Sequence, residues 1–148
     1  MTALHIAKPE DMARLQPLVA AFHGEVGIDR SDASRERGLA PLLDGIPHGV
    51  AYLIGPQKAP IGYVVISFGW SVELGGLDGF VDEIYIRPGV RGRGIGSEVL
   101  LKLPKALASA GLCALHLEVS RDNTRVRALY EKLHFKPREQ YMLMTREM

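Results

Sequence analysis

The sequence predicts a mixed α/β fold: a mostly antiparallel sheet that includes one parallel crossover pair and is flanked by helices. Two observations carry this prediction. In the first half of the chain, a helical apolar pattern precedes two strand-like runs joined by Gly55-Pro56, which indicates an antiparallel hairpin. In the second half, strand-like and helix-like segments alternate, and this order implies a crossover between parallel strands.

The first half is expected to form a strand, two helices and the hairpin. Leu4–Ile6 is a short strand candidate, and Pro9-Glu10-Asp11 supplies a proline and two acids that favour a helix N-terminus. A polar, weaker helix is expected over Ser34–Leu43, and hairpin strands over Val50–Ile54 and Ile61–Phe68. The first helix has one apolar face, made of Met12, Leu15, Leu18, Val19 and Phe22.

The second half is expected to alternate strands and helices up to its end. Pro104 removes one backbone hydrogen bond from the first of these helices, so we expect a kink or break near Leu101–Leu103. The expected elements are a strand over Phe80–Ile86, a helix over Gly94–Ala110, a strand over Cys113–Val119, a helix over Asn123–Leu133 and a closing strand over Tyr141–Thr145.

Length and composition are those of an ordinary globular protein. The chain has 148 residues, 47% of them hydrophobic, which fits a single domain over residues 1–148. Eighteen Lys and Arg against seventeen Asp and Glu give a net charge of +1, too balanced for a protein that mainly binds nucleic acid. No run approaches the roughly 18 apolar residues of a membrane span, and the single cysteine fits a reducing compartment. We therefore expect a cytoplasmic protein.

A basic, glycine-rich turn lies between a predicted strand and a predicted helix. It runs over Arg87–Ser97, and Arg91 and Arg93 alternate with its glycines. Glycines let a ligand approach the backbone closely, and the unpaired N–H groups at a helix start favour an anion. The turn therefore predicts a phosphate site, most naturally for a pyrophosphate. The alternative is a turn whose arginines are merely solvated.

Two other phosphate-binding motifs fit this turn less well. A P-loop requires Lys-Ser or Lys-Thr after the glycines, and neither follows them here. The dinucleotide-binding loop fits in part, since Gly92-x-Gly94 follows a strand and Glu118 lies roughly twenty residues further on. Ser97 stands in place of its third glycine. A dinucleotide-binding module is therefore a less favoured alternative.

Two motifs in order resemble the GCN5-related N-acetyltransferase (GNAT) family. Arg91-x-x-Gly94-x-Gly96, preceded by Asp82–Pro88, looks like the family's acetyl-coenzyme A (acetyl-CoA) motif, and Asn123 followed by Ala128–Phe135 resembles a second family segment. The two cover about Phe80–Pro137. The resemblance implies transfer of an acetyl group from acetyl-CoA to a primary amine. A non-catalytic acyl-CoA-binding regulator on the same fold is the alternative.

The resemblance also implies where acetyl-CoA binds. A backbone N–H of Ile84–Ile86 would polarise the thioester, pantetheine would lie between two splayed parallel strands, and Arg91–Ser97 would bind the pyrophosphate. The resemblance implies that Asn123 contacts the pantetheine arm, and Asn123 is also suited to capping its helix. His134, where the family has glycine, predicts a helix end with positive φ. The expected contacts are Ile84, Tyr85, Ile86, Arg91, Gly92, Arg93, Gly94, Ile95, Gly96, Ser97, Asn123, Arg127 and Tyr130.

Acetyl transfer needs a base for the amine proton and an acid for the leaving thiolate. An alkylamine has a pKa of about 10.4, so it arrives charged at neutral pH. Asp82 and Glu83 are the candidate bases; strand alternation puts them on opposite faces, and the resemblance favours Asp82. The resemblance makes Tyr130 the general acid. The alternatives are carboxylates that only pair with arginines, and a core tyrosine.

Charge distribution favours a small cationic acceptor. Ser71–Ile86 contains four acids and no basic residue, whereas Arg87–Arg93 contains three arginines and no acid. Three further acids, Glu25, Asp29 and Asp32, lie in the early helical region where the family recognises its acceptor.

The remaining candidate residues give weaker indications. Phe68, Trp70 and Phe80 are candidates for lining the acceptor pocket, although such aromatics are more often core residues. Cys113 starts a strand and is expected to be buried. The histidines lack the spacing of a metal site, so no metal is expected. The resemblance is also consistent with a homodimer.

Overall fold

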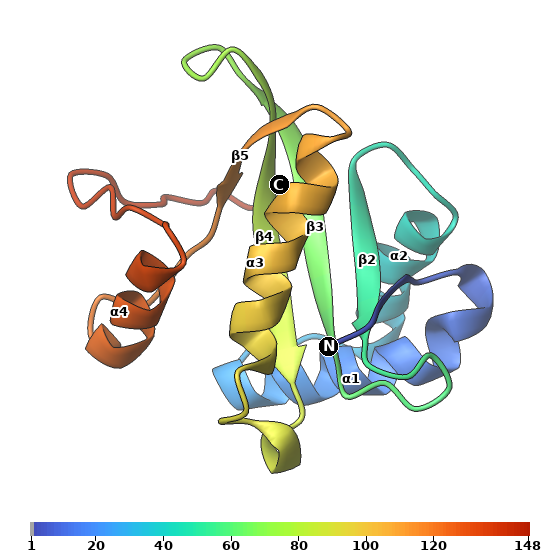
Figure 1. The fold of residues 1–148 in the computed structure, drawn as a ribbon. Coiled ribbons are helices and arrows are strands. Elements are labelled where there is room, and N and C mark those ends of the chain that lie inside the picture. Colours follow the sequence, from blue (N-terminus) through green and yellow to red (C-terminus); the bar gives the residue numbers. More distant parts are fainter. Residues whose placement is uncertain (1) are drawn as a thin grey trace. The chain divides into compact units, whose positions relative to one another are not determined.

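The computed structural model describes residues 2–148, which form two compact units (Figure 1). The first unit extends to Glu118 and contains a five-stranded sheet with three helices. The second unit is Val119–Met148 and contains one helix. Each unit is defined by its own internal contacts.

The sheet has the predicted mixture of pairings. Its strands follow chain order, and the first three pairings are antiparallel, whereas β4 and β5 are parallel. The expected fold class is therefore confirmed. The strands are β1 (Leu4–Ile6), β2 (Gly49–Ile54), β3 (Gly62–Ser71), β4 (Gly76–Ile86) and β5 (Leu112–His116).

Helices flank both faces of this sheet. In Figure 1, α3 crosses the front of the strands, whereas α1 and α2 lie behind them. Short 3-10 turns precede α1 at Pro9–Asp11 and α3 at Pro88–Val90. The helices are α1 (Met12–Val26), α2 (Asp32–Leu43), α3 (Ile95–Ala108) and, in the second unit, α4 (Thr124–Lys132).

The apolar face predicted for the first helix is buried. Leu15, Leu18 and Val19 of α1 pack into one core cluster with side chains of the sheet. The polar helix α2 joins this cluster through Leu39 and Leu43, each 6% exposed. Burial of these leucines holds a helix whose sequence alone is a weak helix former.

Helix α3 continues through Pro104 without the break expected near Leu101–Leu103. Leu100, Leu103 and Leu107 are buried on both sides of the proline. Their packing holds both halves of the helix on the sheet and offsets the lost backbone hydrogen bond.

The predicted closing strand over Tyr141–Thr145 is wrong, because those residues form no strand. A strand requires a partner, and α4 is the one regular element of their unit as described. The expected burial of Cys113 is also wrong: the thiol is exposed. It lies on β5, an edge strand of the sheet that pairs with β4 alone.

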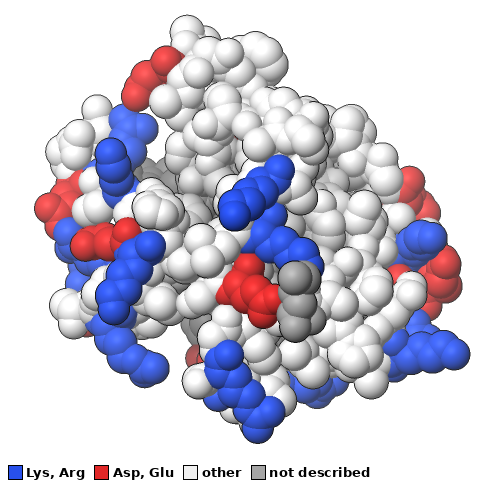
Figure 2. All heavy atoms as spheres, viewed as in Figure 1, with Lys and Arg blue, Asp and Glu red and all other residues white. Residues whose placement is uncertain are grey.

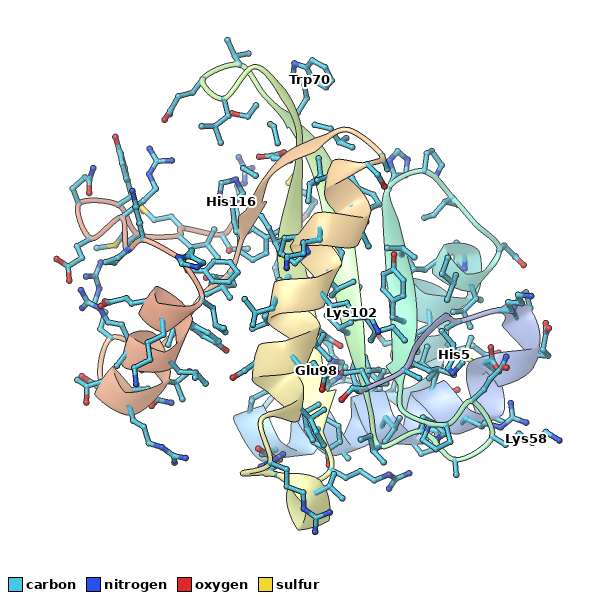
Figure 3. The ribbon with its side chains drawn as sticks, viewed as in Figure 1. His5, Lys58, Trp70, Glu98, Lys102 and His116 are labelled. Atoms are coloured by element: carbon cyan, nitrogen blue, oxygen red, sulfur yellow. The ribbon has the colours of Figure 1, made fainter. Side chains whose placement is uncertain are left out.

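The start of the chain is fastened to the first turns of α3, near Glu98 and Lys102 (Figure 3). Thr2 donates its backbone N–H and its hydroxyl to the two Glu98 oxygens, each at 2.6 Å. Lys102 Nζ in turn donates to the Thr2 carbonyl at 3.0 Å. The hydrogen bonds from Thr2 lower the pKa of Glu98. These hydrogen bonds stabilise the N-terminal part of α3, which follows the glycine-rich turn.

The surface gives no sign of a basic binding face on the side drawn in Figure 2. Lys and Arg side chains lie there among Asp and Glu side chains instead of gathering into one patch. Such a face is unlike the basic stripe of a nucleic-acid-binding protein. Within residues 2–148, no helix is both long and apolar enough to cross a bilayer.

Candidate active site

A β-bulge in β4 brings both candidate bases to one cavity. In the pairing of β3 with β4, Val65 lies opposite Glu83 and Ile66 lies opposite Val81, so Asp82 is the extra residue. A bulge interrupts the alternation of side chains along a strand. Asp82 and Glu83 therefore line the same cavity, and the expectation that they lie on opposite faces is wrong.

This cavity has a volume of about 280 Å³ and lies within the first unit. Helix α1 contributes His23, α2 contributes Arg35, and the bulged strand contributes the two carboxylates. Apolar side chains from the same elements complete its wall, namely Val19, Leu39, Leu42, Val65 and Ile66. The cavity therefore combines an apolar wall with charged groups of both signs.

Two donors from separate elements hold Glu83 in place. Tyr63 donates its hydroxyl to Glu83 Oε1 at 2.8 Å, and His23 Nε2 lies 2.7 Å from Glu83 Oε2. His23 Nδ1 is buried and has no partner among the described residues. Because an ionised carboxylate only accepts hydrogen bonds, Nε2 carries a proton and donates it to Glu83. Burial, and then the Glu83 charge, raises the pKa of Tyr63, so this hydroxyl stays protonated.

Asp82 is exposed at the rim of the cavity, and its pKa is raised. The surrounding protein removes part of the hydration of its carboxyl, and this raises the pKa of Asp82. The like charges of Glu83 and Glu118 raise it further, whereas His23 opposes them. A carboxylate with a raised pKa is a better proton acceptor at neutral pH.

Beyond the bulge, one edge of β4 has no paired strand among residues 2–148. Strand β5 pairs with Leu77–Phe80 and no further along β4. The Arg87 N–H donates to the Ile61 carbonyl at 2.8 Å, toward the β3 side. Since successive backbone groups alternate between the two edges of a strand, the N–H groups of Ile84 and Ile86 point to the open edge. These two amides are placed to bind an extended ligand along β4.

The glycine-rich turn has the backbone geometry of an anion site. Gly92 and Gly94 adopt left-handed φ values of 79° and 76°, and α3 begins at the next residue, Ile95. A Cβ built on Gly92, Gly94 or Gly96 would meet nothing within 4 Å, so the turn is open on that side. The N–H groups of the first helical turn, from Ile95 to Ser97, have no partner within the helix. They are therefore available to an anion.

Arg91 is fixed beside this turn by three contacts. Its Nη2 pairs with Glu25 Oε2 at 2.7 Å, its Nε donates to the Ile86 carbonyl at 2.8 Å, and its guanidinium lies 5.5 Å from the Tyr85 ring centre. The hydrogen bond from Arg91 lowers the pKa of Glu25. Glu25 thus holds a loop arginine and does not line the cavity. The expected contact Arg93 is exposed.

The second unit carries the two polar residues expected from the second motif. Asn123 caps α4, because its side-chain oxygen accepts from the Val126 N–H at 3.2 Å. Tyr130 is half-buried, with its ring 6.1 Å from that of Phe135. Burial raises the pKa of Tyr130, so its hydroxyl is protonated at neutral pH.

Two other features of the second unit bear on the sequence expectations. Arg127, expected to contact the cosubstrate, forms ion pairs with Glu131 at 3.1 Å and with Glu139. His134 has a φ of 73°, which confirms the left-handed helix end predicted from its place in the motif.

The three aromatic candidates do not line the cavity that holds the carboxylates. Phe68 and Phe80 border a smaller cavity of about 170 Å³, where His116 Nε2 lies 3.1 Å from Asp78 Oδ2. Trp70 is 73% exposed near the tip of the hairpin between β3 and β4 (Figure 3). Sequence reasoning instead missed His23, Tyr63 and Arg35, which reach the site from other elements. Across residues 2–148, no group of three or more His, Cys, Asp or Glu is placed to hold a metal ion.

Comparison with known proteins agrees with this geometry. Residues 17–135 match the model of the "Acetyltransferase (GNAT) family". An acetyltransferase of Pectobacterium atrosepticum is 38% identical over 65 residues, which are 42% of this chain and 46% of that protein. The chain thus spans about half the length of the curated relatives it matches.

Solved structures extend the likeness to nearly the whole chain. A protein of Arthrobacter sp. FB24 assigned to the acetyltransferases is 30% identical, with a TM-score of 0.81 over 99% of this chain and 96% of that one. A Clostridium acetobutylicum protein of the same assignment, solved with acetyl-CoA, shares the fold at 19% identity and a TM-score of 0.77, over 98% and 96% of the two chains. The match to the family model covers most of the chain, and the chain belongs to the GNAT acetyltransferase family.

Proposed function

We propose that residues 1–148 act as one N-acetyltransferase domain, which moves an acetyl group from acetyl-CoA to a small primary amine that is cationic in solution. One observation carries the proposal. The bulged strand β4 places two carboxylates in a cavity, frees the amides of Ile84 and Ile86, and leads directly into the open glycine turn. The proposed base, the proposed thioester site and the proposed anion site therefore lie on one continuous segment, β4 and the glycine turn that follows it.

The proposed cosubstrate contacts follow from that segment. The diphosphate binds the N–H groups from Ile95 to Ser97, and Arg91 turns from Glu25 toward it. The pantetheine arm extends along the open edge of β4, where Ile84 or Ile86 donates to the thioester oxygen. The complex of the Clostridium acetobutylicum relative with acetyl-CoA supports this class of cosubstrate.

The proposed reaction is a direct transfer. Asp82, directly or through a water, takes a proton from the ammonium, and the neutral nitrogen attacks the thioester carbon. A C–N bond forms, the C–S bond breaks, and the electron pair leaves on sulfur. Tyr130 donates a proton to this thiolate. Glu83, held by His23 and Tyr63, adds negative charge that attracts the ammonium.

The diphosphate contact is tested by ligand-induced stabilisation. We expect coenzyme A at 100 times its Kd to stabilise the protein by about 2.7 kcal/mol, and pantetheine, which lacks the diphosphate, to stabilise it far less. Thermal unfolding with each ligand measures the difference. Equal effects of the two ligands would contradict the proposed anion site. Protection by NAD but not by coenzyme A would favour a dinucleotide-binding module.

The proposed general acid is tested by Tyr130→Phe. We expect kcat to fall about 10- to 100-fold, because a thiolate is a good leaving group and needs only modest help from an acid. Release of free coenzyme A with an amine panel measures kcat, and calorimetry should give a nearly unchanged Kd for coenzyme A.

Two outcomes would argue against these roles. Equal rates for Tyr130→Phe and the parent protein would remove Tyr130 from the mechanism. Tight coenzyme A binding with no turnover of any primary amine would favour the acyl-CoA-binding regulator. The homodimer and the identity of the base stay predictions.

A further inference from the structure

The cavity that Asp82 and Glu83 line is also lined by two arginines, Arg30 and Arg35. Arg30 lies just before α2 and Arg35 lies in its first turn. The N-terminal end of a helix adds partial positive charge to such groups. One side of the cavity is therefore basic, and the β4 side is acidic.

Arg35 on the basic side and Glu83 on the acidic side are each held by other partners. Arg35 Nη2 pairs with Asp32 Oδ1 at 2.8 Å, and Arg35 Nη1 donates to the Arg30 carbonyl at 2.9 Å. Glu83 is held by Tyr63 and His23 instead. The Asp32 side chain is 77% exposed, so water screens its charge and it neutralises Arg35 only weakly.

Arg35 is also preorganised. Its side chain is 12% exposed, and two of its nitrogens are fixed by the bonds to Asp32 and Arg30. The third, Nε, is buried without a partner among the described residues. Each terminal nitrogen of a guanidinium carries two N–H groups, so Nη1 and Nη2 can each donate once more, and a planar carboxylate accepts two such bonds.

We propose that the amine acceptor is a small amino acid, whose amine faces Asp82 and Glu83 and whose carboxylate binds Arg35 and Arg30. The inference rests on the proposed acetyl transfer and specifies its second substrate. A cavity of about 280 Å³ suits a small molecule that carries both charges. A purely cationic amine would offer no negative group to the basic side of the cavity.

The test compares amino acids with the amines that remain when their carboxylate is removed. The pairs are lysine with cadaverine, 4-aminobutyrate with propylamine, and β-alanine with ethylamine. We expect at least one acid to exceed its matched amine in kcat/KM by about 10-fold or more. In Arg35→Gln, kcat/KM for that acid should fall about 10- to 100-fold and the preference should disappear.

The control is Arg37→Gln, a change of the same kind on the same helix. Arg37 is exposed and lies outside the cavity lining, so the preference should persist in that variant. Arg30→Gln replaces an exposed side chain. It is the second test variant for the carboxylate subsite if Arg35→Gln does not fold. It too should reduce the preference.

A binding measurement separates this inference from the proposed function. The same pairs are titrated by calorimetry into the protein saturated with coenzyme A. Tighter binding of an acid than of its amine, lost in Arg35→Gln, supports the carboxylate subsite even without turnover. Equal or tighter binding of the amines overturns the subsite and leaves the acetyltransferase proposal intact. Failure of coenzyme A itself to bind would overturn both.

Discussion

Replacing Asp82 with asparagine is expected to lower kcat about 100- to 10,000-fold, the usual contribution of a positioned general base. Asparagine keeps the size of the side chain and lacks a carboxylate that accepts the amine proton. Steady-state release of coenzyme A from acetyl-CoA, with a free amine that the parent protein acetylates, measures the loss. The Kd for coenzyme A should change little, because its proposed contacts lie on Ile84, Ile86 and the glycine turn.

The pH profile supplies an independent readout of the same role. Reduced hydration and the charges of Glu83 and Glu118 raise the pKa of Asp82. Since a base acts when unprotonated, kcat/KM should fall as the pH drops through this raised pKa, at a higher pH than an ordinary Asp would give. Asp82→Asn should remove that acidic limb.

Glu118→Gln provides a matched control for the electrostatics. It removes one of the negative charges that raise the pKa of Asp82, so the acidic limb should move to lower pH while the carboxylate remains. A limb that stays in place in Glu118→Gln and also persists in Asp82→Asn would identify another group as the base. A larger loss in Glu83→Gln than in Asp82→Asn would point to Glu83.

The elements of the first unit were predictable because each has a local signal. The three- and four-residue apolar spacing around Leu15 and Leu18 indicates a helix, and the hairpin follows from Gly55-Pro56 between two strand-like runs. The glycine turn was equally visible, since φ values such as that of Gly94 are rare in other residues. Such signals depend on neighbours in the chain.

The catalytic geometry was less predictable because it depends on pairing between distant residues. The bulge at Asp82 exists only in the register that sets Val65 opposite Glu83, and nothing in residues 76–86 alone encodes that register. The partners of Glu83 are 20 and 60 positions away in the chain. An apolar helix position and a strand position gave no reason to assign His23 or Tyr63 to the site.

The predicted strand over Tyr141–Thr145 failed for a related reason. Its mostly apolar run is compatible with a strand, and a strand also requires an available neighbour to pair with. The described unit from Val119 onward offers α4 and no strand. The local pattern therefore predicted a strand that does not form, because it carries no information on a partner strand.

Gly62→Ala is expected to destabilise the protein by about 3 kcal/mol or more, because the new methyl group has no space. A Cβ on Gly62 would lie 2.1 Å from the backbone oxygen of Tyr85 and 3.1 Å from its carbonyl carbon. These are main-chain atoms of the β3–β4 ladder, which cannot turn away as a flexible side chain can. Relief requires β4 to shift, and β4 also carries the free amides of Ile84 and Ile86. Urea unfolding measures the lost stability, and residual folded protein should show lower kcat.

The matched control is Gly24→Ala, the same chemical change in the last turn of α1. A Cβ on Gly24 would meet nothing within 4 Å, so the substitution adds no contact and only restricts the unfolded chain. We expect a gain of about 0.5–1 kcal/mol there, because alanine is the better helix former. Opposite signs at the two positions would show that the close approach of β3 to Tyr85, and not the loss of a glycine, determines the result. A Gly62→Ala protein as stable as its parent would mean that β3 and β4 are not paired so closely at this point.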